Sequence, residues 1–277
     1  MIHWLTDPFA TDFMKRALAV AVFVGVLSPI VGTWIVLRRL AYLGDAMSHA
    51  TLAGVGIAFA AGASVLLGAL GAGIVMAMLL LLLSANRRLG QDAIIGVIET
   101  AMFSIGVIVI GSVDTGVELS HFLFGQVLTV TRGDVIASFV LTLVAVGVIV
   151  LMFGDLRMAT FDPVHARQVG VRVGLVHGVL LVLLAITIVV SLRTVGTLMS
   201  VAMLVTPAAT ARLVTRSVAT MTLVGAGVGL VSAVTGLILQ YHLDSPPGAT
   251  IALVAVAIFA VVYAVTLPRR LPHHVRA

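Results

Sequence analysis

The sequence predicts an all-α polytopic membrane protein, and composition and segment length both support this class. Of the 277 residues, 61% are hydrophobic and only 10% are charged, with a mean hydropathy of +1.22. Soluble domains are about one quarter charged. The apolar segments run to ~20 residues, which suits helices that cross a ~30 Å hydrocarbon layer and not the ~10-residue strands of a membrane barrel. We therefore expect one transmembrane domain over residues 1–277.

About nine apolar segments follow one another along the chain. Their approximate bounds are 14–37, 41–61, 64–85, 92–112, 133–153, 173–193, 195–214, 218–240 and 248–267. The second and seventh segments are the two candidates for a broken or re-entrant helix, which is tolerated where it is buried in protein. Eight full crossings are therefore the alternative to nine.

Lys and Arg divide unequally between the two sides of this nine-segment arrangement. One side receives twelve of them: Arg38, Arg39, Arg87, Arg88, Arg157, Arg167, Arg172, Arg212, Arg216, Arg269, Arg270 and Arg276. The other side receives four: Lys15, Arg16, Arg132 and Arg193. Because cytoplasmic loops carry the excess of Lys and Arg, we predict that the N-terminus lies outside and the C-terminus in the cytoplasm. The net charge of +5 then reflects topology and gives no reason to expect nucleic acid as a partner.

Two absences narrow the chemistry of the chain. There is no cysteine, which excludes disulfides and thiolate metal sites. The only lysine is Lys15, and no glycine pattern of a phosphate-binding loop precedes it. Any ATP must therefore be handled by another polypeptide.

The stretch "GDAMSHA" places two ionisable residues, Asp45 and His49, in the second apolar segment. At a spacing of four residues they share one helical face, about 6 Å apart, so both can reach one small ligand. His49 is expected roughly 12 Å inside the segment, where ionisable groups mark substrate or proton pathways. A carboxylate with an imidazole suits a divalent ion such as Zn, Mn or Fe(II). A helix-capping Asp45 and a His49 bonded to a neighbouring helix are the structural alternative.

Two ligands are too few for one metal, because such ions take four to six donors. A two-fold dimer would supply two copies of the pair, and the small residues Ala46, Ala50, Ala53 and Gly54 beside it would let two such helices approach.

Glu99 is the other unusual acid. It lies about 10 Å inside the fourth segment, a depth similar to that of His49. Burying a charged carboxylate in a membrane costs about 2.5–3.5 kcal/mol, so Glu99 is expected to be paired, protonated or in contact with water. It is a further candidate for the ion path, and a protonated acid bonded to a neighbouring helix is the alternative.

The cytoplasmic segment 161–170, "FDPVHARQVG", predicts a short helix. Asp162 is a good N-cap, Pro163 fits the first helical position, and Gly170 suits a left-handed C-terminal cap. A helix of two turns is unstable alone, so it should pack against a partner or, alternatively, lie against lipid.

The stretch "LRRLAYLGDAMSHATLAGVGIAF" resembles the signature of the permeases of manganese, zinc and iron importers of the ATP-binding cassette (ABC) type. The segments "HFLFGQVL", "FDPVHARQVGV", "LVTPAATARLVTR" and "DSPPGATIAL" agree with that family in the same order. There are two departures. Ala53 stands where the family often has proline, and Glu99 stands where it more usually has an apolar residue.

The resemblance implies a permease homodimer in the bacterial cytoplasmic membrane that is fed by an extracytoplasmic metal-binding protein and driven by cytoplasmic ATPase subunits. It implies that Asp45 and His49 hold the transported Mn, Zn or Fe, and that no cofactor is bound covalently. The hard carboxylate in the pair favours Mn slightly. The resemblance also implies that segment 161–170 is a coupling helix that contacts the ATPase. The residues concerned are Asp162, Pro163, Val164, His165, Ala166, Arg167 and Gly170.

Two other classes of function remain open from the residues. One is a proton-coupled secondary metal carrier without an ATPase, and the other is an assembly subunit that transports nothing. Three further groups are weaker metal candidates. His121 is read as a structural loop residue, Met199 and Met203 as core or gate packing, and the tail pair His273 and His274 as a poor preformed site.

Overall fold

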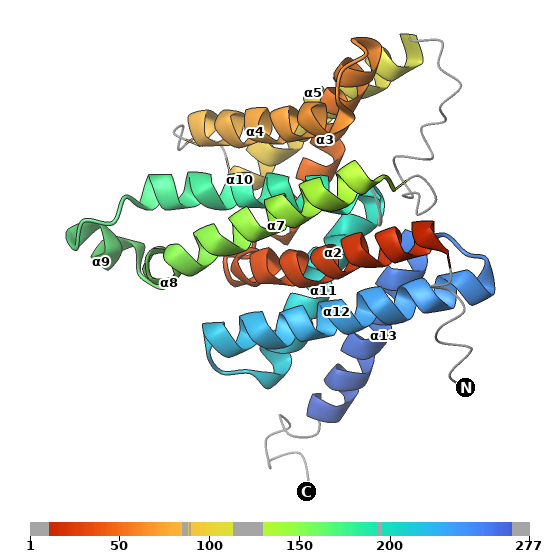
Figure 1. Ribbon diagram of the computed structural model, residues 1–277. Coiled ribbons are helices and arrows are strands. Elements are labelled where there is room, and N and C mark those ends of the chain that lie inside the picture. The colour runs from red at the N-terminus through yellow and green to blue at the C-terminus, as the bar shows by residue number, and fades with distance from the viewer. Residues whose placement is uncertain (1–10, 85–87, 89, 113–129, 193–195, 268–277) are drawn as a thin grey trace, which may run out of the picture.

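The computed structural model describes residues 11–84, 88, 90–112, 130–192 and 196–267, and this part of the chain contains helices and turns but no strand. The helices are α2 (Asp12–Leu37), α3 (Ala41–Ala60), α4 (Val65–Leu83), α5 (Gln91–Ser112), α7 (Arg132–Leu151), α8 (Phe153–Phe161), α9 (Pro163–Gln168), α10 (Val173–Leu192), α11 (Thr197–Val214), α12 (Val218–Leu243) and α13 (Pro247–Thr266). Each of the nine expected apolar segments corresponds to one of these helices, so the all-α class is confirmed (Figure 1).

Seven of the described helices are long and apolar enough to cross a membrane. They are α2, α4, α5, α7, α10, α12 and α13. Among the helices that match the nine expected segments, α3 and α11 fall short of these criteria, and they are the two segments for which the sequence predicts a broken or re-entrant helix. A count of nine crossings and the orientation of the termini therefore stay predictions.

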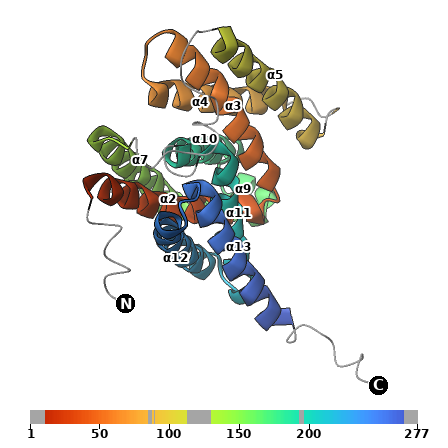
Figure 2. The same cartoon turned by 90° about the vertical axis from the view of Figure 1, so that its right-hand side faces the viewer.

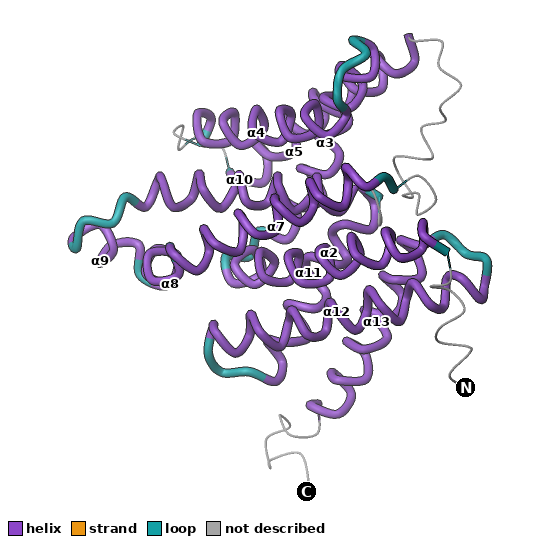
Figure 3. The backbone as a smooth tube through the Cα atoms, viewed as in Figure 1, coloured by secondary structure: helices purple, strands orange, loops and turns teal. Residues whose placement is uncertain are grey.

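The helices pack as two groups (Figures 1 and 2). The central helix α2 packs extensively against α12 and α11, and also against α7 and α10, while α13 covers α11 and α12. In the second group α3 lies between α4 and α5, and it joins the first group through α10 and α11. The tube in Figure 3 shows that turns join most helices that follow one another. Some consecutive helices, such as α3 with α4 and α12 with α13, therefore pack side by side, whereas α2 and α3 make little contact.

Glycine brings α3 into backbone contact with both of its neighbours. A Cβ atom on Gly54 would lie 1.9 Å from the carbonyl oxygen of Gly68 on α4. On the other side, a Cβ atom on Gly106 of α5 would lie 2.8 Å from the backbone nitrogen of Ala53. In lipid such close approach supplies the packing energy that the hydrophobic effect cannot. These contacts fix which face of α3 points toward α5.

Candidate metal site

The predicted pair lies on α3 with the expected geometry. Nε2 of His49 is 3.7 Å from Oδ1 of Asp45. The side chain of His49 is 22% exposed and that of Asp45 is 42% exposed. A partly open carboxylate can exchange ligands with water, whereas a closed four-ligand structural site cannot. The pair is therefore accessible and still held by the helix.

Glu99 joins this pair from α5. One ligand atom from each of Asp45, His49 and Glu99 lies within 4.8 Å of the others, and no other group of three or more such residues with this geometry occurs in the described part of the chain. His49 and Glu99 each stand eight residues after the first residue of their helix. At a rise of about 1.5 Å per residue, both residues lie ~12 Å from the start of their helices along the helix axis. Similar depth and close packing of α3 on α5 bring them together.

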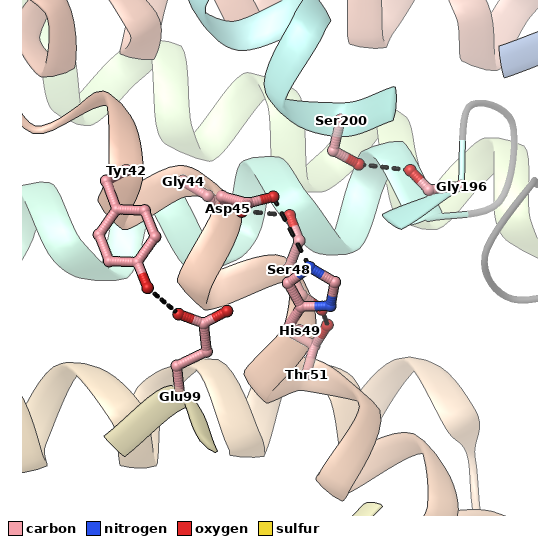
Figure 4. Close-up of polar contacts among 9 residues, drawn as sticks. All are labelled: Tyr42, Gly44, Asp45, Ser48, His49, Thr51, Glu99, Gly196 and Ser200. Carbon is pink, nitrogen blue, oxygen red and sulfur yellow. Dashed lines mark hydrogen bonds and ion pairs between the residues drawn. The ribbon is translucent and has the colours of Figure 1, made fainter. Parts of the chain in front are cut away.

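Two aromatic side chains orient the cluster. Tyr42 lies on α3 one turn before Asp45. Its hydroxyl donates a hydrogen bond of 2.7 Å to Oε2 of Glu99 (Figure 4). The ring of Phe103 meets the ring of His49 edge to face, with centroids 5.4 Å apart. Nδ1 of His49 is buried and has no hydrogen-bond partner among the described residues. The ring orientation therefore depends on packing against Phe103 and on Asp45.

Buried hydroxyls beside the site are satisfied within their own helices. Ser48 donates to the carbonyl oxygen of Gly44 at 2.9 Å, and Thr51 donates to that of Ser48 at 2.7 Å. On α11, Ser200 donates to the carbonyl oxygen of Gly196 at 2.6 Å (Figure 4). These hydroxyls already have partners, so the three titratable residues remain the best ligand set.

The small-residue ridge on α3 is used inside one protomer. Ala46 and Ala50 are fully buried, Ala53 is 5% exposed, and Gly54 packs on α4. The expectation that this ridge brings two copies of α3 together is therefore wrong, because α3 presents it to helices of its own chain. Shared use of the pair by two copies would need another surface.

The short helix predicted within segment 161–170 forms in the structure. Asp162 caps α9 by accepting a 2.9 Å hydrogen bond from the backbone N–H of His165, and Pro163 is the first helical residue. Gly170 has a φ of +88°, the left-handed conformation expected after a helix end. Of the segment 161–170, only Ala166 is buried. The rest is exposed, including the apolar Val164.

The remaining candidates divide into two sets. Met203 is fully buried, as expected for core packing. His121, His273 and His274 lie outside the described residues, and the side chain of Met199 is not described either.

A bundle of apolar helices with a partly exposed cluster of two carboxylates and an imidazole has the features of a polytopic membrane transport protein. The chain belongs to the ABC 3 transport family, whose sequence profile matches residues 10–266. It is a membrane permease subunit and not an enzyme, and it is a multi-pass protein of the bacterial inner membrane.

Curated relatives cover most of the chain. A manganese transport system membrane protein of Halalkalibacterium halodurans is 40% identical over 253 residues, which is 91% of this chain and 87% of the relative. A chelated iron transport system membrane protein of Yersinia pestis is 36% identical over 262 residues, covering 93% of this chain and 86% of that protein.

Two solved structures share the fold. PsaBC from Streptococcus pneumoniae, in complex with Fab, matches with a TM-score of 0.87 and 32% identity over 95% of both chains. A metal-chelate type ABC transporter in an inward-facing conformation matches with a TM-score of 0.72 over 91% of this chain and 85% of that chain. At 18% identity the second likeness shows the fold alone.

Proposed function

We propose that this chain is the membrane permease of an ATP-driven importer of a divalent first-row transition metal, and that Asp45, His49 and Glu99 bind the ion in transit. The observation that supports this most is their grouping, because the ligand atoms lie within 4.8 Å of one another at a partly buried position between α3 and α5. The family and the relatives named for manganese and iron transport point to the same class of substrate.

The donor set favours manganese or iron(II) over zinc. Two carboxylates and one imidazole are hard and borderline ligands, which suit Mn and Fe(II), whereas no thiolate is present to select a soft ion. Three protein donors leave positions for water on an ion that takes more ligands than three. Such an incomplete shell allows both capture and release, as transport requires.

Two copies of the chain are expected in the importer. Each protomer then carries its own set of three ligands, since Asp45, His49 and Glu99 all come from one chain. An alternative is one ion shared by both copies across a homodimer interface. Equilibrium binding of manganese to the purified complex separates the two, because independent sites bind two ions per dimer and a shared site binds one.

The exposed helix α9 is proposed as the contact for the cytoplasmic ATPase. Its Val164 is 62% exposed and the adjoining Phe161 is 61% exposed. Apolar side chains that are this exposed, on and beside a helix of two turns, are expected to pack against a partner surface. An extracytoplasmic metal-binding protein is expected to deliver the ion at the opposite face.

Reconstitution of the chain with its ATPase into liposomes tests the proposal. We expect manganese uptake that requires ATP and is lost in Glu99→Gln, Asp45→Asn and His49→Gln. Asp92→Asn is the matched control, because this acid lies in the first turn of the same helix α5 and is exposed. Uptake driven by a pH gradient alone would instead identify a secondary carrier. Normal uptake by all three site variants would contradict the ligand assignment.

A further inference from the structure

A tight turn connects the central helix α2 to the helix that carries the metal ligands. Helix α2 ends at Leu37 and α3 begins at Ala41. Within the turn Arg39 has a φ of +59°, and the backbone N–H of Leu40 donates to the carbonyl oxygen of Ile35 at 3.0 Å. A left-handed arginine closed by such a bond makes a well-defined connection. Any displacement of the turn therefore reaches Asp45, five residues after Leu40.

The side chain of Arg38 ties this turn to two other helices. Its Nε donates to Oγ1 of Thr160 on α8 at 3.0 Å, and its Nη1 lies 3.2 Å from Nδ1 of His177 on α10. A guanidinium is only a donor, so Nδ1 of His177 accepts and the imidazole is neutral with its proton on Nε2. The hydroxyl of Thr160 in turn donates a hydrogen bond to the carbonyl oxygen of Leu156 at 2.6 Å. One cation thus bridges three helices.

The two partners of Arg38 flank helix α9 in the sequence. Thr160 precedes the N-cap Asp162 by two residues, and His177 lies on the second turn of α10, which follows α9. A second contact joins the same elements, since Trp34 of α2 meets Phe153 of α8 edge to face at 5.4 Å. Both ends of the segment that displays α9 are therefore attached to the end of α2.

Arg38 differs from the solvated arginines on the same side of the bundle. Arg212 is exposed, whereas Arg38 is half-buried and its Nη2 is buried with no hydrogen-bond partner among the described residues. Burial lowers the pKa of Arg38 from its usual value, because the charged form loses water. Removing an arginine from water is unfavourable unless its bonds are retained. An arginine whose only role is to set the orientation of the chain in the membrane would not need to be half-buried and bonded to two other helices.

We propose that Arg38 is a positioning residue that transmits movement of the α8–α9 segment to the metal ligands on α3. The inference rests on the proposed function, in which an ATPase moves α9. Glu99 stands on α5, which packs mainly on α3 and α4 and makes no substantial contact with α8 or α9. A shift of the turn through Arg38 therefore reaches Asp45 and His49 directly along α3, but reaches Glu99 only through the packing of α5 on α3 and the bond from Tyr42. This difference changes the geometry of the three ligands and favours release of the ion.

The test uses the complex of this chain with its ATPase in proteoliposomes, with Thr160→Val and Arg38→Lys as variants. Valine keeps the shape of threonine but accepts no bond, and lysine cannot bond both partners as the guanidinium fork does. We expect manganese uptake to fall about threefold to thirtyfold, the range for residues that carry coupling between sites. ATP hydrolysis and equilibrium manganese binding should stay within about twofold of wild type, so more ATP is spent per ion.

Thr222→Val is the matched control. Thr222 donates to the carbonyl oxygen of Val218 within α12 at 2.9 Å, as Thr160 does within α8, but it has no described bond to Arg38. It should leave the ATP-to-ion ratio unchanged.

Three outcomes decide the inference. An unchanged ratio in both Arg38→Lys and Thr160→Val would overturn it. Loss of uptake, hydrolysis and thermal stability together would also overturn it, because the network would then be structural. Wild-type complex that shows no ATP-dependent uptake would instead refute the proposed function and leave the bonding of Arg38 as a feature of the fold.

Discussion

Removal of the Tyr42 hydroxyl is a sharp perturbation of the proposed site. In Tyr42→Phe the ring stays and only the donor to Oε2 of Glu99 is lost, a bond of 2.7 Å. A hydrogen bond to a charged group contributes about 1.5–3 kcal/mol when shielded from water. Tyr42 is 47% exposed, so water replaces part of the lost bond and the effect should be smaller.

The expected cost to metal binding is about 1 kcal/mol, since Glu99 must then be ordered when the ion binds and fixing a glutamate side chain costs up to ~2 kcal/mol. At 1.4 kcal/mol per factor of ten, manganese should bind about fivefold more weakly. The measurement is equilibrium binding of manganese to the purified complex by isothermal titration calorimetry. Tyr263→Phe is the control, because Tyr263 is also 47% exposed but lies on α13 and stacks on Phe259.

The same effect should vanish when Glu99 is already changed. In a Glu99→Gln background the added Tyr42→Phe change should cost less than about 0.3–0.5 kcal/mol, because the two residues act through one bond and their effects are not additive. Equal cost in both backgrounds, or tighter binding by Tyr42→Phe alone, would refute the argument that Tyr42 orients Glu99 for the ion.

The remaining predictions concern helix packing and the short helix α9. Gly54→Ala should destabilise the protein by roughly 1–3 kcal/mol, because the added Cβ atom would lie 1.9 Å from the carbonyl oxygen of Gly68 on α4. Gly71→Ala on α4 meets nothing within 4 Å and should be nearly neutral in the same thermal unfolding assay. Asp162→Ala removes the cap of α9 and should cost about 1 kcal/mol of helix stability. The readout is weaker ATPase retention in affinity purification, and an unaltered yield would count against α9 as the docking helix.

Much of the fold could be predicted from the sequence because its signals are local. Apolar segments long enough to span lipid determine the helices, and the Asp162, Pro163 and Gly170 signals determine the ends of α9. The Asp45 and His49 spacing also places both side chains on one face without any tertiary information. These features depend on neighbours within a few residues, so one sequence suffices for them.

The rest depends on how helices pack, which no local signal specifies. Glu99 could be recognised by its depth, but its approach to Asp45 and His49 requires the close packing of α3 on α5 at Gly106. The ridge of Ala46 and Ala50 has the composition of a helix contact without naming the partner helix. Its use inside the protomer could not be inferred from spacing.

The Arg38 network is hidden for the same reason. Its bonds reach Thr160 and His177, more than 100 residues away. In the sequence Arg38 is one of twelve basic residues on the side predicted to be cytoplasmic. The excess of positive charge on that side is enough to account for its presence. Only its burial and its two partners distinguish it.

Anomalous diffraction from crystals of the complex grown with manganese tests the central claim most directly. The account predicts one anomalous peak in each protomer, bonded to oxygen of Asp45, oxygen of Glu99 and nitrogen of His49, and its loss in Glu99→Gln crystals. A manganese peak elsewhere in the bundle, with these three side chains bonded only to protein, would contradict it.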